Sequence, residues 1–221
     1  MKIMFFFFKP RKEGSITLKI TIISPPKPKK GEAKVVSQLL ELGLERFHLR
    51  KPDCNISQIA TLLDEIPKEF LSRIIIHRMP ELLKDYPLGG YHHSEREDFR
   101  EIKGIRSRSL HKLNHLQNCD NELDYVFFGP VYQSISKKGY RPKVSLNEIR
   151  KTILKMKNQP NAPLVYALGG IRRNKISYLR ETGFDGVALL GSIWGKPDPV
   201  DSYLSFRDAI ENQYPLESSR H

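Results

Sequence analysis

Three kinds of sequence feature that often indicate a protein's function are scarce or absent in this sequence. It has only two cysteines in 221 residues, Cys54 and Cys119, and they lie far apart. That pair offers neither metal-ligand spacing nor a disulfide framework, and it is consistent with the reducing cytoplasm. No G-x-G-x-x-G motif follows the first expected strand, which argues against a dinucleotide-binding protein. Internal repeats and low-complexity linkers are also lacking, so we expect a single domain.

Long apolar runs are missing as well. The run near the start of the chain covers only residues 3–8, which is too short to span a bilayer, and no small-residue cleavage site follows it. We therefore expect no membrane span, no signal peptide and a cytoplasmic location. Residues 1–16 are expected to form an N-terminal extension outside the core fold, and residues 17–221 to form the domain itself.

Acidic residues are too few to balance the basic ones. The chain has 37 Lys and Arg against 25 Asp and Glu, which gives a formal net charge of +12. A basic protein favours anionic partners, either phosphorylated metabolites or nucleic acid. Because the basic residues are dispersed and match no nucleic-acid-binding module, we favour a small phosphorylated partner over nucleic acid.

Eight short segments have the apolar and β-branched composition of strands, and segments with helical spacing separate most of them. The expected strands are 18–24, 45–50, 73–77, 86–93, 105–110, 124–128, 164–168 and 186–190. The expected helices are 33–44, 56–66, 80–85, 146–156, 174–182 and 203–211. Such alternation is typical of parallel strands. Eight units predict an α/β fold, a closed (β/α)₈ TIM barrel, with an open doubly wound sheet as the alternative.

Residues 124–139 combine a buried strand with a polar loop. Val126–Phe128 is a short apolar run that Gly129-Pro130 ends, as expected of a buried strand. Hydroxyl and ammonium groups follow it at Ser134, Ser136, Lys137 and Lys138. Because ligands bind beyond the carboxyl ends of barrel strands, this loop is predicted to contact an anion, most simply a phosphate. A solvated loop is the alternative.

Glycine-containing turns follow the last two expected strands, at Gly169-Gly170 and Gly191-Ser192. In barrels, the loops after strands seven and eight often hold a phosphate. Glycine lets backbone N–H groups approach the anion, and the start of a helix adds positive partial charge. These glycines could simply turn the chain, but two such turns at consecutive strand ends favour a phosphate site.

Five of the seven histidines lie at or near the ends of expected strands. They are His48, His77, His92, His93 and His111. A closed barrel would bring several of them to one rim, where they could ligate a metal. Their spacing is irregular, however, and no clear set of carboxylates or thiolates joins them. We therefore favour a histidine that transfers protons over a metal site.

In their order and spacing, these motifs resemble the thiamine phosphate synthase superfamily, which includes thiazole tautomerases. The resemblance extends from about Leu18 to Ile210. The matching motifs are His48-Leu49-Arg50, Ser107-Arg108-Ser109-Leu110-His111, Asp124-Tyr125 through Gly129-Pro130, Ser134 with Ser136 and Lys137, Gly169-Gly170-Ile171, Gly186-Val187-Ala188 and Gly191-Ser192-Ile193. The resemblance implies a single-domain TIM barrel that acts on a phosphorylated thiazole in thiamine biosynthesis.

The resemblance leaves two activities open. The synthase joins a pyrimidine diphosphate to a thiazole phosphate with Mg²⁺, whereas the tautomerase moves a proton within a thiazole phosphate carboxylate and needs no cofactor. The synthase has an Asn-Asp pair where this chain has His77-Arg78, and its magnesium aspartate falls near Glu97. Losing a carboxylate weakens a magnesium site. These departures slightly favour the tautomerase, with His111 as its catalytic residue, over the synthase.

The resemblance also implies which residues contact the substrate. Arg50 would hold the carboxylate, and the glycine-containing turns would hold the phosphate. The other implied contacts are His48, His77, His92, Ser109, Ser134, Ser136 and Lys137. No metal ligand is expected for the tautomerase, and Glu97 would ligate Mg²⁺ only in the synthase. A non-catalytic protein that binds a phosphorylated metabolite is a further alternative, and a homo-oligomer is left open.

Overall fold

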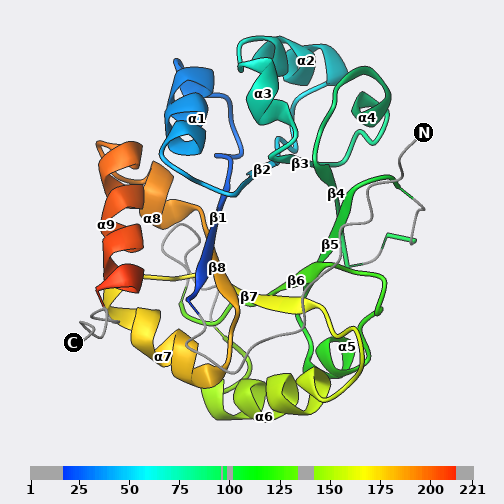
Figure 1. Cartoon of the computed structure of the whole chain (residues 1–221), viewed down its shortest axis with the longest axis vertical. Coiled ribbons are helices and arrows are strands. Elements are labelled where there is room, and N and C mark those ends of the chain that lie inside the picture. The colour runs from blue at the N-terminus through cyan, green and yellow to red at the C-terminus, as the bar shows by residue number, and fades with distance from the viewer. Residues whose placement is uncertain (1–16, 96, 99–101, 134–141, 213–221) are drawn as a thin grey trace, which may run out of the picture.

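Eight parallel strands close into a barrel in the order in which they occur along the chain (Figure 1). The structure is a computed structural model that describes residues 17–95, 97–98, 102–133 and 142–212. The strands are β1 (Lys19–Ile23), β2 (Arg46–Leu49), β3 (Ile74–His77), β4 (Gly90–His93), β5 (Ile105–Leu110), β6 (Tyr125–Phe128), β7 (Leu164–Leu168) and β8 (Gly186–Leu189). Strand β8 pairs with β1 and closes the ring. The predicted barrel is therefore confirmed, and the open sheet is excluded.

Helices surround the ring of strands on its outside (Figure 1). They are α1 (Glu32–Glu41), α2 (Ile56–Asp64), α3 (Lys68–Leu71), α4 (Leu82–Asp85), α5 (Leu113–Gln117), α6 (Leu146–Lys157), the 3₁₀ turn η1 (Arg173–Lys175), α7 (Ile176–Thr182), α8 (Gly191–Trp194) and α9 (Pro199–Glu211). Side chains define where several of them begin. Asn55 and Ser145 form capping boxes at α2 and α6, and Asp198 caps α9 ahead of Pro199, because each oxygen accepts a backbone N–H that lacks a partner within the helix.

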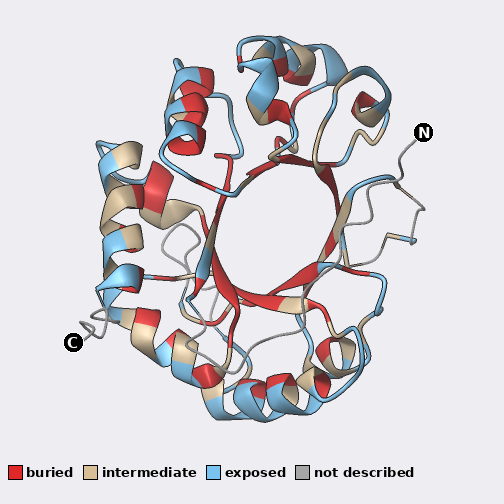
Figure 2. Cartoon of the chain, in the orientation of Figure 1, coloured by how far each residue is buried: buried red, intermediate tan, exposed pale blue. Residues whose placement is uncertain are grey.

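The apolar residues form two separate cores. The larger one lies between the barrel and the helices, and the smaller one lies inside the barrel. Figure 2 shows most of the strand residues buried and the helices exposed on their outer side. The inner core consists of Ile23, Tyr125, Phe127, Tyr166 and Ala188. Its members come from β1, β6, β7 and β8, so one side of the barrel interior is apolar and aromatic.

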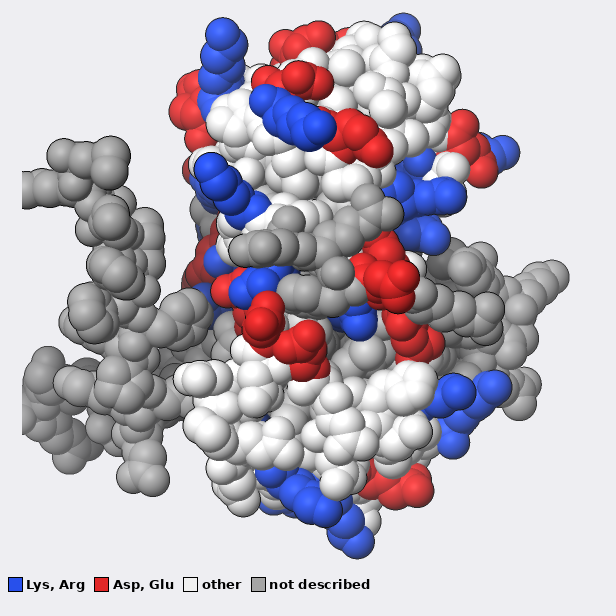
Figure 3. Space-filling view, turned by 90° about the vertical axis from the view of Figure 1, so that its right-hand side faces the viewer, with Lys and Arg blue, Asp and Glu red and all other residues white. Residues whose placement is uncertain are grey.

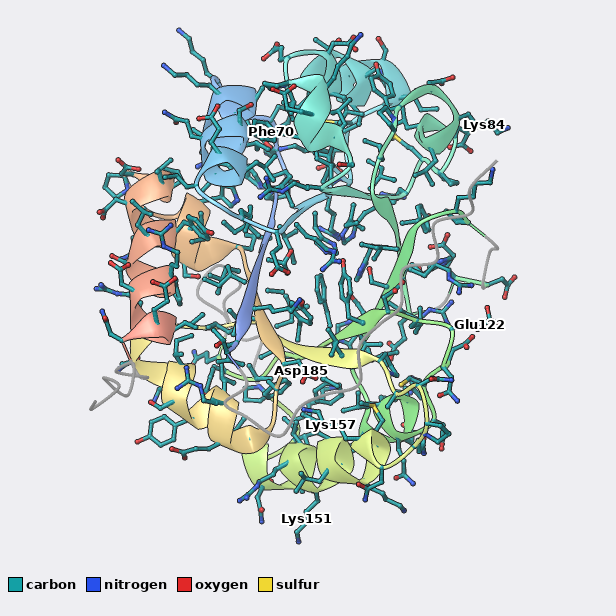
Figure 4. All side chains as sticks on the ribbon, viewed as in Figure 1. Phe70, Lys84, Glu122, Lys151, Lys157 and Asp185 are labelled. Atoms are coloured by element: carbon teal, nitrogen blue, oxygen red, sulfur yellow. The ribbon has the colours of Figure 1, made fainter. Side chains whose placement is uncertain are left out.

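Polar residues fill the other side of the interior. Successive residues of a strand point to opposite faces, and this alternation brings His48, His77, His92 and Ser107 inward from β2 to β5. All four are at least nine-tenths buried. A closed barrel therefore contains a polar half built from imidazoles and hydroxyls, and Figure 4 shows side chains filling the ring of strands.

An ion pair fastens α6 to the strands on the lower side of Figure 4, where both residues are labelled. Lys157 Nζ lies 3.0 Å from Asp185 Oδ1. The second oxygen of Asp185 accepts the backbone N–H of Val165, the second residue of β7. Because Asp185 directly precedes β8, the pair connects α6 with two neighbouring strands at their amino ends, away from the ligand-binding end of a barrel.

Three short helices were not predicted. No helix was expected at α3 or α5, and at α8 a phosphate-binding turn was expected at Gly191-Ser192 without a helix of defined bounds. Helices of four or five residues are too short to show a periodic pattern, so only their end residues could have revealed them. The predicted fourth strand also began too early, because β4 starts only at Gly90. The predictions for residues 1–16 and for Ser134, Ser136 and Lys137 lie outside the described residues.

Charged side chains of both signs share the face of the molecule shown in Figure 3, where blue and red groups lie intermingled. That distribution agrees with the dispersed basic residues noted in the sequence. No helix within the described ranges is both long enough and apolar enough to cross a membrane.

Candidate active site at the barrel mouth

A cavity of about 1050 Å³ lies at the carboxyl ends of the strands. Its lining includes Arg50, His77, His92, Ser109 and His111, all of which the sequence analysis had singled out. They come from the ends of β2, β3, β4 and β5. The barrel thus brings five predicted site residues, separated by as many as 61 positions, to one cavity.

Three imidazoles lie together at the base of this cavity, two of them lining it, and we call His48, His77 and His92 the histidine cluster. His48 Nδ1 lies 2.8 Å from His77 Nε2. The rings of His77 and His92 are stacked with centroids 4.1 Å apart, and the His48 ring meets both edge-on. His48 does not line the cavity itself, because it is fully buried beneath the other two.

Hydroxyl groups hold the outer nitrogens of this cluster. Tyr125 Oη lies 2.7 Å from His48 Nε2, and the hydroxyls of Ser107 and Ser109 each lie 2.8 Å from a nitrogen of His92. Burial lowers the pKa of all three histidines well below the ordinary value, and neighbouring imidazoles and arginines add to the effect. The cluster is therefore uncharged at neutral pH.

Two arginines follow β2 and β3 and place positive charge at the cavity. The backbone of Arg50 is fixed because its N–H donates to Ser24 Oγ, and that hydroxyl donates to the Arg50 carbonyl. Arg78 has a φ of 62°, in the left-handed region that non-glycine residues seldom adopt, and its guanidinium donates to the carbonyl of Pro52. Strained backbone of this kind is frequent at binding sites.

His111 lies on the rim of the cavity in a fixed orientation. Its Nδ1 lies 2.6 Å from the carbonyl oxygen of Gly129 and donates to it, which leaves Nε2 able to accept a proton. Its backbone N–H donates to Glu95, which also contacts His115. Partial burial acts to raise the pKa of the Glu95 carboxyl, but these hydrogen bonds outweigh it and the pKa lies below its ordinary value.

Glu97, the residue expected to ligate magnesium in the synthase, accepts two hydrogen bonds from its neighbours. Glu97 Oε1 accepts the Tyr91 hydroxyl at 2.7 Å, and Oε2 accepts the backbone N–H of Ser94 at 3.1 Å. Over the described ranges, the only close group of three or more potential ligands is the histidine cluster, which has no carboxylate. Mg²⁺ requires oxygen ligands. It is usually bound through one or two carboxylates together with substrate phosphates and water, and the carboxylates that line this cavity are Glu81, Glu95 and Glu97.

The two glycine turns follow neighbouring strands, since Leu168 of β7 pairs with Ala188 of β8. Gly169 and Gly170 have φ values of 93° and 68°. A Cβ on Gly170 would lie 2.3 Å from the carbonyl oxygen of Gln133, so the turn packs directly against the loop after β6. The indole of Trp194 donates to the Ile23 carbonyl at 2.8 Å and ties α8 to β1.

Gly191 and Ser192 line a second cavity of about 1040 Å³. It meets the first cavity at Leu190, which lines both. Its cationic lining residues are Lys29, Arg172, Arg173 and Lys196; Asp198 and Asp201 also line it. Of the predicted phosphate contacts, Gly191 and Ser192 therefore face a basic cavity, whereas Gly169 and Gly170 are not among the lining residues of either cavity. Sequence reasoning missed these four cations, since each lies outside the motifs.

Comparisons with known proteins agree on one family. The family model described as thiamine monophosphate synthase matches residues 20–193. A thiamine-phosphate synthase of Prochlorococcus marinus (strain AS9601) is 39% identical over 115 residues, which cover 52% of this chain and 30% of that protein. The chain thus spans less than a third of that relative. A thiamine-phosphate synthase of Phocaeicola vulgatus is 28% identical over 173 residues, which cover 73% of this chain and 83% of that protein.

Solved structures agree with this assignment. The crystal structure of a thiamine phosphate pyrophosphorylase from Bacteroides thetaiotaomicron superposes with a TM-score of 0.76 at 26% identity, covering 90% of this chain and 100% of that one. A thiamine phosphate pyrophosphorylase from Pyrococcus furiosus has a TM-score of 0.71 at 19% identity, with coverages of 90% and 98%, and supports the fold alone. The family match extends over most of the barrel, and the chain belongs to the thiamine monophosphate synthase family.

Proposed function

We propose that this protein is a thiamine-phosphate synthase that joins a pyrimidine diphosphate to a phosphorylated thiazole and releases diphosphate. The observation that carries the proposal is a pair of cavities that share the lining residue Leu190 at one end of the barrel. The first is lined by Arg50 and Arg78 together with Glu81, Glu95 and Glu97, and in the second the cations outnumber the carboxylates. Two anionic substrates need two anion sites within reach of each other. The names of the relatives favour this activity over the tautomerase that the sequence slightly favoured.

The mouth cavity suits the diphosphate. Arg50 and Arg78 come from neighbouring strands, and arginine binds phosphate oxygens in a bidentate manner. When the bond to the diphosphate breaks, negative charge develops on the departing oxygen, and fixed cations stabilise it. We assign this role to the two arginines that line the cavity.

The second cavity suits the single phosphate of the thiazole. Gly191 and Ser192 begin α8, whose first backbone N–H groups have no partner within the helix. Lys29, Arg172 and Arg173 add positive charge around them. A phosphate bound there would place its thiazole toward Leu190 and the mouth cavity, where the pyrimidine would lie.

A thiazole tautomerase is the second candidate, and the geometry of His111 favours it. The hydrogen bond to Gly129 fixes the imidazole and leaves Nε2 to carry a proton at the cavity. A positioned general base typically contributes about 10²–10⁴ in rate. Its substrate carries a carboxylate and a phosphate on one molecule and involves no diphosphate, so the two cavities by themselves do not distinguish it from the synthase.

Incubation of the purified protein with both substrates distinguishes the candidates. The synthase predicts thiamine phosphate and diphosphate in equal amounts, with turnover lowered by Arg50→Gln and retained by His115→Ala, a rim histidine that lines neither cavity. The tautomerase predicts no coupling, but conversion of the carboxylated thiazole phosphate that His111→Ala abolishes. Binding of thiazole phosphate with neither turnover would identify a non-catalytic binding protein and refute the proposal.

A further inference from the structure

We propose that the histidine cluster binds a divalent transition-metal ion, most simply Zn²⁺. One ring nitrogen from each of His48, His77 and His92 lies within 4.8 Å of the other two. Zinc binds histidine nitrogens at about 2.0–2.1 Å, so ligands in a tetrahedral site lie about 3.3–3.4 Å apart. The separation of 2.8 Å between His48 Nδ1 and His77 Nε2 falls short of that value by about 0.5 Å. The three nitrogens lie within 4.8 Å of one another, and the rings of His77 and His92 are stacked, so metal binding requires these rings to rotate until their nitrogens point to one centre.

The chemistry of the donors selects the kind of metal. Imidazole nitrogens suit Zn²⁺, Co²⁺, Ni²⁺ and Cu²⁺, whereas Mg²⁺ and Ca²⁺ require oxygen ligands. No carboxylate belongs to the cluster. Its surroundings are the aromatic rings of Tyr125 and Phe127, which pack against His48. The site would thus take a transition metal rather than the magnesium that the family resemblance implies.

Groups that could orient the ligands are already in place. Metal-bound histidines normally donate their other ring N–H to a neighbouring oxygen. Tyr125 Oη lies 2.7 Å from the outer nitrogen of His48. Ser107 and Ser109 contact the two nitrogens of His92, so either nitrogen can ligate while the other keeps a hydroxyl partner. In the metal-bound form His48 would ligate through Nδ1 and carry its proton on Nε2, which would donate to Tyr125 Oη.

The position of the cluster leaves one side open. His77 and His92 line the mouth cavity, and His48 lies beneath them. A metal held by the three rings would therefore present its fourth coordination position to the cavity. Three protein ligands with an open position are typical of catalytic zinc sites, whereas structural sites have four. An oxygen of water or of an anionic ligand could complete the tetrahedron.

A chain of hydrogen-bonded imidazoles without any metal is the competing explanation. The contact between His48 and His77 satisfies both nitrogens if one of them carries a proton. Such a network would stabilise the barrel core and would not depend on metal. The two explanations differ in whether the cluster binds a metal in solution, which can be measured without any substrate.

The test is a Co²⁺ titration of the untagged, full-length protein after chelator treatment. Cobalt is a spectroscopic substitute for zinc, and its visible d–d absorption reports a low-symmetry site. We expect one equivalent to bind with an intense tetrahedral spectrum, to be displaced by Zn²⁺ and to raise the melting temperature. An octahedral spectrum, several weak equivalents or no saturable binding would overturn the proposal whatever the variants do.

Variants then locate the site. His77→Asn and His92→Asn should each lower Co²⁺ affinity by at least about 100-fold, and Tyr125→Phe by about 10–100-fold through the loss of an orienting oxygen. His115→Asn, outside the cluster, is the matched control and should not change it. Equal affinity in all four variants would place the metal elsewhere and refute the proposal. Circular dichroism of each metal-free variant verifies folding. Because no substrate is present, failure of the synthase proposal would leave this result unaffected.

Discussion

The turn after β7 accepts no side chain at Gly170, a residue predicted from the sequence to contact the phosphate. This residue has a φ of 68°, and a Cβ would lie 2.3 Å from the Gln133 carbonyl oxygen. Gly183 provides a matched control in the same chain. It has a φ of 96°, but its Cβ would meet only a methyl group of Ile153, at an ordinary 3.5 Å. Alanine at the two positions therefore shares the backbone strain and differs in the clash.

The expected stabilities follow from these distances. The left-handed conformation costs a non-glycine residue about 1–2 kcal/mol, and the reduced freedom of the unfolded chain offsets about 0.4–1 kcal/mol of it. We thus expect Gly183→Ala to lower the free energy of unfolding by about 1 kcal/mol. Gly170→Ala adds an overpacking cost of about 1–3 kcal/mol, since a backbone oxygen must move. Its total loss should reach about 2–4 kcal/mol.

Urea unfolding followed by circular dichroism measures both losses, and calorimetry measures binding of thiazole phosphate. If the Gly169-Gly170 turn holds the phosphate, its displacement in Gly170→Ala should weaken phosphate binding at least about 10-fold, a difference of about 1.4 kcal/mol. Gly183→Ala should bind it as the wild type does. Equal destabilisation by the two substitutions would disprove the clash. Unchanged phosphate affinity in a destabilised Gly170→Ala protein would show that the Gly169-Gly170 turn does not hold the phosphate.

Three further predictions concern charge and proton transfer. Lys51→Met should destabilise the protein by about 3–5 kcal/mol at neutral pH, because it leaves the buried Glu32 carboxylate, now 2.6 Å from Lys51, without its counter-ion. Burial already raises the pKa of Glu32, so the loss should shrink as the pH falls toward about 4.5 and grow as it rises, which urea titrations at several pH values would measure. Arg50→Gln should weaken diphosphate binding by about 10–150-fold, equivalent to about 1.5–3 kcal/mol, with only partial recovery in Arg50→Lys, by calorimetry. His111→Ala should slow any proton transfer by about 10²–10⁴ while thiazole phosphate affinity stays nearly constant; equal loss of both would make the residue structural.

The sequence was sufficient for the fold because its longer elements have an unambiguous pattern. The strand RIIIH at 73–77 and the helix at 146–156 show clear composition or period, and the structure has both within one residue at each end. The weak fourth strand was predicted to end at His93, as β4 does, but its start was placed too early because Gly89 and Gly90 carry no side-chain pattern. The helix α5 was missed for a related reason, because its five residues include only two leucines among polar neighbours.

Only the site residues that lie at strand ends could be predicted from the sequence. Arg50, His77, His92, Ser109 and His111 could be assigned to one rim once the barrel was expected, and the structure brings them together. The contacts among them could not be predicted, since a strand pattern tells which face a residue occupies but not which neighbour it meets. The role of each of these residues in catalysis stays a prediction.

The division of the barrel interior explains why the imidazoles can cluster there at all. A polar group buried inside a protein costs free energy unless it forms a hydrogen bond. The aromatic half, with Tyr125, Phe127 and Tyr166, fills the volume that would otherwise admit water, while the hydroxyl of Tyr125 reaches His48. Replacing Tyr125 with Phe would keep the ring and remove only the hydroxyl. If the Tyr125 hydroxyl orients His48 for metal binding, its removal should weaken metal binding far more than it disturbs the packing of the barrel.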